Sequence, residues 1–172
     1  MLDDVSTINK VDTGQLGFNP ETLNIGDFCE RLIAEERDIN QNGYTLHFVK
    51  SGNCNRVHMD PQLLQHILHN LLSNAFKYSP AGSAVHVSLE CDEKYVRLSV
   101  TDEGIGIPPD DIQFLFDQCH RGRNVENIKG TGLGLAITRT CVDAHNGTIQ
   151  VESKLGEGST FIVTLPKYTL AR

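Results

Sequence analysis

The sequence has no tryptophan, no CxxC pair and no apolar run long enough to cross a bilayer. Its seven histidines include no HExxH or similar ligand pattern, and its five cysteines are an odd number without metal-ligand spacing. No signal-peptide pattern opens it. These absences argue against a membrane contact, a zinc site and a disulfide framework. They favour a reducing, cytoplasmic location.

Positive charge is scarce as well. Lys and Arg number 15 against 22 Asp and Glu, which gives a net charge of −7. General nucleic-acid binding relies on a basic surface and is therefore not expected. An anionic small molecule would need a local basic cluster. The length of 172 residues fits one domain plus a short extension, and 39% apolar residues are enough for one core.

Periodicity predicts an α+β domain. We expect a first helix from an Asp27 cap to about Gln41, with Phe28, Leu32 and Ile39 facing inward. The second helix starts at Asp60-Pro61, a strong start signal, and carries one apolar stripe. The stripe consists of Leu63, Leu64, Ile67, Leu68, Leu71, Leu72 and Phe76. A third helix is expected over 131–145. Strands are expected at Tyr44–Val49, Val85–Leu89, Tyr95–Val100, Thr148–Glu152 and Ser159–Leu165.

The N-terminal stretch has a different character. Leu2, Val5 and Ile8 recur at helical spacing, but so short a helix is not stable alone in water. We interpret 1–17 as the tail of a longer helix and Phe18–Leu23, which contains Pro20, as a linker, so that 1–19 precedes the domain. The globular domain is expected over 20–168, followed by a tail at 169–172.

The second helix also carries a polar edge. Asn70, Asn74 and Lys77 fall within roughly 60° of arc on a helix of 3.6 residues per turn. Carboxamide oxygens suit Mg²⁺, and a lysine ammonium suits phosphate. The alternative is an ordinary solvated helix face.

Two glycine-rich segments follow. In Asp102-Glu-Gly104-Ile-Gly106-Ile107, the glycines allow a flat ligand to approach the backbone, and the Asp102 carboxylate can accept from an exocyclic amine. A tight turn after a strand is the alternative. Gly130-Thr131-Gly132-Leu133-Gly134 precedes a helix, where free backbone N–H groups suit a triphosphate. It is neither a P-loop nor a GxGxxG fingerprint. Arg121, Arg123 and Lys129 supply the basic cluster.

The order of these segments resembles the GHKL ATPase superfamily, and within it the sensor histidine kinases. Asn70-Leu-Leu-Ser-Asn74-Ala-Phe-Lys77-Tyr78-Ser is similar to their N box, 102–106 to the G1 box and 130–134 to the G2 box. Phe114 and Phe116 stand where the F box begins. The resemblance covers roughly residues 20–168. It implies a two-layer α/β sandwich of the Bergerat type, with a mixed sheet of about five strands, three helices on one face and a flexible ATP lid.

The resemblance also implies roles. Asn74 would hold Mg²⁺ with Asn70 beside it, Lys77 would contact phosphate, and Asp102 would read the adenine amine. Residues of about 117–130 would form the lid, with Arg121 on the triphosphate. The full set implied to contact ATP is Asn70, Asn74, Lys77, Tyr78, Asp102, Gly104, Gly106, Ile107, Arg121, Gly130, Thr131, Gly132, Leu133 and Gly134. No catalytic residue is assigned within the chain.

Two departures from the family pattern stand out. Cys119 replaces a second F-box aromatic. No histidine lies in the H-[ED]-x-[RK]-x-P motif of the phosphoacceptor. Residues 1–17 resemble the end of the dimerisation-domain helix that would carry it. We therefore expect a histidine kinase that cannot transfer phosphate without a dimerisation domain, that serves a response-regulator receiver and that is monomeric alone. A serine-directed GHKL kinase, a GHKL ATPase and a degenerate nucleotide-binding module remain alternatives.

Overall fold

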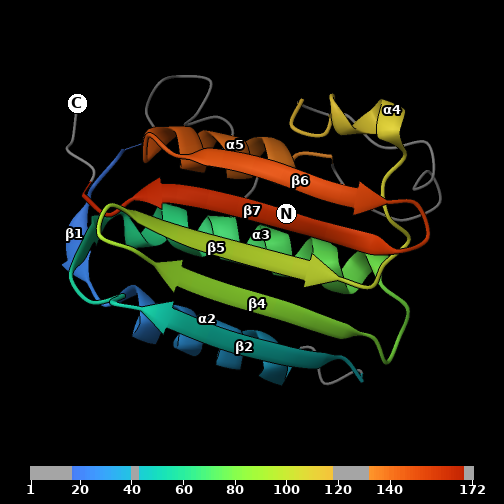
Figure 1. Cartoon of the computed structure of the whole chain (residues 1–172), viewed down its shortest axis with the longest axis horizontal. Coiled ribbons are helices and arrows are strands. Elements are labelled where there is room, and N and C mark those ends of the chain that lie inside the picture. The colour runs from blue at the N-terminus through green and yellow to red at the C-terminus, as the bar shows by residue number, and fades with distance from the viewer. Residues whose placement is uncertain (1–16, 40–42, 118–131, 169–172) are drawn as a thin grey trace.

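A mixed sheet in the order β2-β4-β5-β7-β6 forms one layer, and α2, α3 and α5 cover one of its faces (Figure 1). The computed structural model describes residues 17–39, 43–117 and 132–168. β2 runs parallel to β4, and the other neighbours are antiparallel. The strands are β2 Thr45–Gly52, β4 Ala84–Cys91, β5 Tyr95–Asp102, β6 Thr148–Lys154 and β7 Gly158–Pro166, and the helices are α2 Ile25–Ile39, α3 Pro61–Tyr78 and α5 Gly134–Ala144. The expected α+β sandwich is confirmed.

The core lies between the sheet and the helices. β4 and β5 alternate buried and more exposed residues, as period-2 strands with one face on a core must. Helix α3 lies along the middle of the sheet and supplies every member of the predicted apolar stripe as a buried side chain. The start signal is confirmed too, since the Asp60 side chain accepts from the N–H groups of Gln62 and Leu63.

Helix α2 begins earlier than predicted. Asn24, not Asp27, provides the cap, because its Oδ1 accepts from the Asp27 N–H at 3.2 Å. The buried stripe is correspondingly centred on Ile25, Cys29 and Ile33. Phe28 and Leu32 are only half-buried. Asn and Asp are both good caps, and burial of Ile25 decides between them.

The remaining helices also differ from the expectation. Helix α5 starts at Gly134, and the part of the predicted helix around Thr131 lies outside the described residues. The four-residue α4, Pro109–Ile112, was not predicted. None of the described helices is both long and apolar enough to cross a membrane.

A second, two-stranded sheet lies at one end of the molecule. β1, Glu21–Leu23, pairs antiparallel with β3, Val57–Met59, so that Glu21 lies opposite Met59. Part of the segment that we interpreted as a linker is therefore a strand. Strands of three residues carry almost no local signal, since their pairing partner decides them.

The cysteine prediction was wrong in one respect. Cys54 and Cys91 form a disulfide, with Cα atoms 5.3 Å apart. The 37-residue separation encloses β3, α3 and most of β4. In the chain-entropy view, closing a loop of this length stabilises the fold by about 4 kcal/mol. Because disulfides are typical of oxidising compartments, cysteine usage no longer supports a cytoplasmic location.

Two other cysteines are free and buried. Burial raises the pKa of both the Cys29 and the Cys141 thiol to about 12. Both thiols are therefore protonated and unreactive at neutral pH. Cys119 lies outside the described residues.

Candidate functional site

The polar edge of α3 lies beside its buried stripe, as predicted. Asn70, Asn74 and Lys77 are half-buried, between the core and solvent. Among the described residues, none hydrogen-bonds the Asn74 carboxamide. An amide in that state can bind a metal ion or water without first breaking a protein contact.

Helix α3 meets the start of α5 at Asn70. Its Nδ2 donates to the Gly134 carbonyl at 3.1 Å. Since a carbonyl only accepts, this contact fixes the orientation of the amide and leaves Oδ1 available as an acceptor. The Thr138 hydroxyl donates to the same carbonyl at 2.9 Å. The predicted N-box and G2-box segments, 64 residues apart between Asn70 and Gly134, are therefore in contact.

The other end of α3 meets the loop after β5. The Tyr78 carbonyl accepts from the Ile105 N–H at 3.1 Å. A Cβ on Gly104 would lie 2.7 Å from that carbonyl oxygen and 2.6 Å from Asp102 Oδ1. Only glycine fits between these two groups. The glycine thus brings the last turn of α3 against the Asp102 carboxylate.

Asp102 is a buried carboxylate at the end of β5, with 7% of its surface exposed. Burial raises its pKa, and the hydrogen bonds that it accepts from the Gly104 and Ser159 N–H groups act in the opposite direction. The Gly104 bond measures 2.8 Å. The carboxylate is held in one orientation and can accept a further donor such as an amine.

The β6–β7 turn supports the glycine-rich loop from behind. Gly106 has a φ of +67°, and a Cβ there would lie 2.1 Å from the Lys154 carbonyl oxygen. The Ile107 N–H donates to Ser153 Oγ at 2.9 Å, and the Gly156 N–H donates to the Ile105 carbonyl at 2.8 Å. The loop is therefore fixed before any ligand arrives.

Lys77 is the basic residue on the polar edge of α3. Its Nζ donates to the Tyr78 hydroxyl at 3.0 Å and lies 4.7 Å from the centre of that ring. The neighbouring aromatic ring holds the ammonium group at the end of the helix.

The remaining predicted residues fall partly outside the description. Arg121, Gly130 and Thr131 lie outside the described residues, as do Arg123 and Lys129. Gly132, with a φ of +71°, and Leu133 precede α5. Of the predicted F-box aromatics, Phe116 packs against the core and Phe114 is exposed.

Most of the described domain also matches a known family model. Residues 59–169 match the model of the histidine kinase-, DNA gyrase B- and HSP90-like ATPases. The chain belongs to this ATPase family.

The relatives of this ATPase domain include sensor kinases. Sensor histidine kinase WalK of Bacillus subtilis is 35% identical over 172 residues, covering 96% of this chain and 28% of that protein. The adaptive-response sensory kinase SasA of a Synechococcus strain is 42% identical over 117 residues, covering 67% of this chain and 31% of that protein. The chain thus spans less than a third of the length of these relatives.

Solved structures of histidine kinases share the fold of the ATPase domain. The catalytic domain of ThkA superposes with a TM-score of 0.76 at 26% identity, covering 87% of this chain and 99% of that one. Full-length ShkA, solved in complex with AMPPNP, superposes with a TM-score of 0.83 at 25% identity, covering 99% of this chain and 36% of that one.

Sequence reasoning assigned no role in the site to the residues of the β6–β7 turn that support it. A Cβ on Gly158, with a φ of +92°, would lie 2.0 Å from the Asp102 carbonyl oxygen. The hydroxyl of Ser153, which accepts from the Ile107 N–H, also forms a hydrogen bond with the Ser159 hydroxyl, with 2.9 Å between the two Oγ atoms. The GxG pattern at 156–158 was the available signal, because paired glycines mark a turn that needs positive φ.

Proposed function

We propose that the chain binds Mg·ATP and presents the γ-phosphate to a histidine on a dimerisation domain, as the catalytic domain of a two-component sensor histidine kinase. The observation that supports this most strongly is the pair of contacts made by α3. Asn70 contacts Gly134, and Tyr78 contacts Ile105, so two glycine-rich segments meet the helix that carries the polar edge.

The donor set fits magnesium. Mg²⁺ usually takes only one or two protein ligands and completes its octahedron with phosphate oxygens and water. Asn74 and Asn70 would offer two carboxamide oxygens one helical turn apart. The ion would supply charge neutralisation on the phosphates.

Each remaining residue would have a defined task. Asp102 would accept from the adenine amine, while Gly104 and Gly106 would let the base approach the backbone and Ile107 would line it. Lys77 and Tyr78 would border the phosphates and the nucleoside. Arg121 and the segment Gly130–Gly134 would contact the triphosphate.

The acceptor imidazole nitrogen attacks the γ-phosphorus, the bond to the bridging oxygen breaks and ADP leaves. The imidazole is itself the nucleophile, so positioning and electrostatics account for the catalysis.

The partners follow from this chemistry. A dimerisation domain would carry the acceptor histidine, and a response-regulator receiver would accept the phosphoryl group next. ThkA, whose catalytic domain shares this fold, has been solved in complex with response regulator protein TrrA. We propose a cytoplasmic location, where ATP is available, and a monomeric chain when it is separated from a dimerisation domain.

The deciding experiment mixes the chain with a separately made dimerisation domain and γ-labelled ATP. Label on the dimerisation domain that is acid-labile and base-stable supports the proposal. Acid-stable label on serine would show a serine-directed GHKL kinase instead. Calorimetric Mg·ATP binding without any transfer would identify a degenerate binding module, and steady phosphate release without transfer would identify an ATPase.

The adenine role of Asp102 has a test of its own. Asp102→Asn should weaken ATP binding by about 10-fold or more, because a charge-assisted hydrogen bond is lost. Its preference for ATP over GTP should also shrink, since an amide can donate to the guanine carbonyl. Glu103→Gln, at the exposed neighbouring carboxylate, is the matched control and should bind like the wild type. Equal ATP affinity in Asp102→Asn would refute the assignment.

A further inference from the structure

Asp60 and His145 form a buried contact at the ends of α3 and α5 that lie away from the proposed nucleotide contacts. They are 2% and 0% exposed. Asp60 Oδ1 accepts from the N–H groups of Gln62 and Leu63 at 2.9 and 3.1 Å. Asp60 Oδ2 accepts from the Asn19 N–H at 2.7 Å. One carboxylate therefore serves both the start of α3 and the segment that enters the domain.

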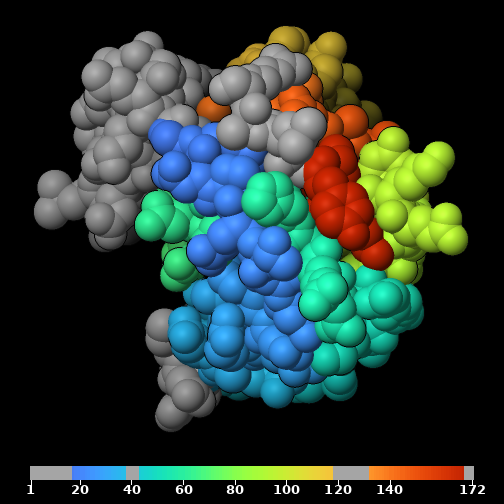
Figure 2. Space-filling model, turned by 90° about the vertical axis from the view of Figure 1, so that its left-hand side faces the viewer, coloured from blue at the N-terminus to red at the C-terminus, as the bar shows by residue number. Residues whose placement is uncertain are grey.

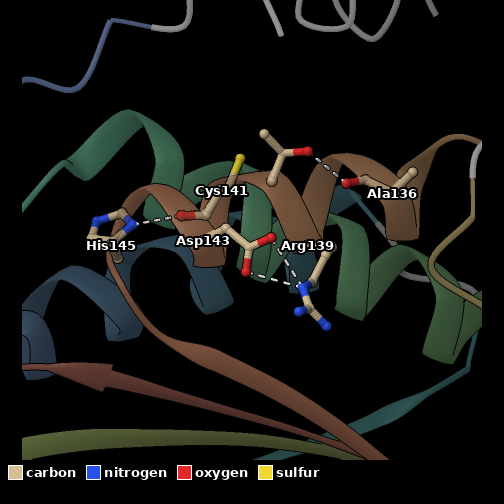
Figure 3. Close-up of polar contacts among 6 residues, drawn as sticks. Ala136, Arg139, Cys141, Asp143 and His145 are labelled. Atoms are coloured by element: carbon tan, nitrogen blue, oxygen red, sulfur yellow. Dashed lines mark hydrogen bonds and ion pairs between the residues drawn. The ribbon is translucent and has the colours of Figure 1, made fainter. Parts of the chain in front are cut away.

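His145 connects the same residue to the end of α5. Its Nδ1 lies 2.8 Å from the Cys141 carbonyl oxygen, and Figure 3 shows the ring turned toward that carbonyl. Because a carbonyl only accepts, Nδ1 carries the proton, and Nε2 accepts from the Asp60 N–H at 3.1 Å. The Phe18 ring packs edge-on against the imidazole, with centroids 5.1 Å apart.

Helices α3 and α5 are thereby connected by polar contacts at two levels. The Asp60–His145 contact joins the start of α3 to the end of α5. The Asn70–Gly134 contact joins the middle of α3 to the start of α5. Ten residues separate Asp60 from Asn70, which is about 15 Å along a helix. Between these two contacts, α3 and α5 carry buried side chains that include Ile67, Leu68 and Ile137. Close packing of this kind makes a helix pair move as one body.

The entering segment is attached to this pair. β1 pairs with β3 up to the Glu21–Met59 position, immediately before Asp60. Figure 2 shows the blue N-terminal segment lying on the surface beside the turquoise stretch that includes β3. Asn19 and Phe18 extend this attachment onto Asp60 and His145.

We infer that Asp60 is a positioning residue that couples docking of the 18–23 segment to the nucleotide site through the α3–α5 pair. The inference rests on the proposed function, because it concerns the same Asn70–Gly134 contact. A shift of the segment at Asn19 moves the α3–α5 pair at the Asp60–His145 contact. Because the two helices move together, the shift also reaches the Asn70–Gly134 contact. The coupling is reciprocal, so nucleotide binding must also strengthen the docking of Asn19.

The decisive variant removes a single backbone donor. Asn19→Pro deletes the N–H that Asp60 accepts, while Asn19→Ala keeps it and serves as the matched control. Pro20 favours the extended region at residue 19, a region that includes conformations proline can adopt. We expect Asn19→Pro to lower Mg·ATP affinity by about 5-fold or more, the usual lower range of allosteric coupling, and Asn19→Ala to stay within about 2-fold of the wild type.

Two further measurements separate coupling from simple destabilisation. Asp60→Asn leaves the backbone unchanged but has one acceptor oxygen for three N–H donors, so its affinity should fall between those of the Asn19 variants. Hydrogen exchange of the Asn19 amide in the wild-type chain should slow when Mg·ATP saturates the site. This second measurement needs no variant to fold.

The outcomes are distinct. A wild-type chain that fails to bind Mg·ATP sinks the proposed function, and the coupling falls with it. If the wild type binds Mg·ATP but Asn19→Pro binds equally well, or the Asn19 amide exchanges at the same rate with and without nucleotide, the coupling is wrong and the proposed function stands. Lower urea stability of Asn19→Pro with unchanged affinity would make the joint purely structural.

Discussion

The two ends of α3 are built in opposite ways. At the first turn, both Asp60 carboxylate oxygens accept hydrogen bonds and its N–H is taken by His145. At the last turns, no described residue hydrogen-bonds the Asn74 carboxamide, and the buried Ser79 hydroxyl has no hydrogen-bond partner among the described residues. The polar groups of Asp60 at the first end have protein partners, whereas the Asn74 carboxamide and the Ser79 hydroxyl have none among the described residues.

This difference predicts that substitutions cost mainly stability at the first end of the helix and mainly affinity at the second. A buried polar group without a partner lowers stability, so a fold retains it where another requirement outweighs the cost. The first turn stabilises the domain and attaches the entering segment. The last turns carry the groups that we propose to contact Mg·ATP. Substitutions at the two ends should accordingly have different signatures.

The largest expected effect is at the second end. Asn74→Ala should lower Mg·ATP affinity by more than about 100-fold, beyond the loss typical when only an outer-shell partner of a metal is removed. The urea stability of the same variant should be equal to or slightly above that of the wild type, because alanine is the better helix former. Calorimetry and urea unfolding measure the two quantities. Ser73→Ala, at the exposed neighbouring position, should change neither by much. Unchanged affinity in Asn74→Ala would disprove the metal role.

The next largest effect is a loss of stability at the first turn of α3. Asp60→Ala should reduce the free energy of unfolding by about 2–3 kcal/mol, since it loses a helix cap and leaves the buried Leu63 N–H and the Asn19 N–H without their acceptor. Asp60→Ser, which keeps a capping oxygen, should lose about half as much. Urea denaturation followed by circular dichroism gives both values. An Asp60→Ala chain as stable as the wild type would show that the cap is dispensable.

A smaller effect concerns pH at the same end. Burial lowers the pKa of His145, opposed by its hydrogen bond to the Cys141 carbonyl and by the nearby Asp60 charge. Unfolded histidine titrates near 6.5, so the unfolded chain binds the proton more readily. The contribution of His145 is fully present above about pH 6.5 and is lost as the pH falls through that value toward the folded pKa.

Urea midpoints between pH 7.5 and 5.5 test this pH dependence. The wild type should lose stability over that range, and His145→Gln, although less stable, should have a flatter profile. The pKa of Asp102 is raised, which acts in the opposite sense at lower pH, so the difference between the two profiles isolates the histidine. Parallel profiles would rule His145 out as the source.

The smallest expected effect is at Ser79, where one substitution should raise stability and lower Mg·ATP affinity. Ser79→Ala removes a buried hydroxyl that lacks a partner among the described residues and should stabilise the ligand-free chain by up to about 1 kcal/mol. Mg·ATP affinity should fall a few-fold if the bound state supplies the hydroxyl with its missing hydrogen bond, directly or through water. A loss of stability in the ligand-free variant would show that solvent already satisfies the hydroxyl, and the contrast between the two ends of α3 would weaken.

Sequence reasoning performed best where local signals agreed. The start of α3 was predicted because Asp60-Pro61 combines a cap with a preferred first residue, and the apolar stripe followed from helical periodicity. The five main strands were predicted to within a few residues because one of their faces meets the core. The site residues stay predictions, although the structure brings Asn70, Asp102 and Gly134 around one helix.

Sequence reasoning failed where a distant partner decided the outcome. β1 and β3 are too short to show a pattern and exist through their mutual pairing. The Cys54–Cys91 disulfide depends on the parallel register of β2 and β4, which brings Gly52 opposite Cys91. An odd cysteine count without CxxC spacing gave no indication of that register.

The sequence by itself therefore determined the three long helices, the five strands of the main sheet, the polar edge of α3 and the glycines that the Asp102 loop requires, since these depend on periodicity and on backbone geometry within a few residues. Only the tertiary structure decided which distant groups meet. The Asp60 carboxylate accepts from a residue 41 positions away, and the Asp60 N–H donates to one 85 positions away. Such contacts depend on the order of strands in the sheet and on the antiparallel packing of α3 and α5, and spacing along the chain carries no record of either.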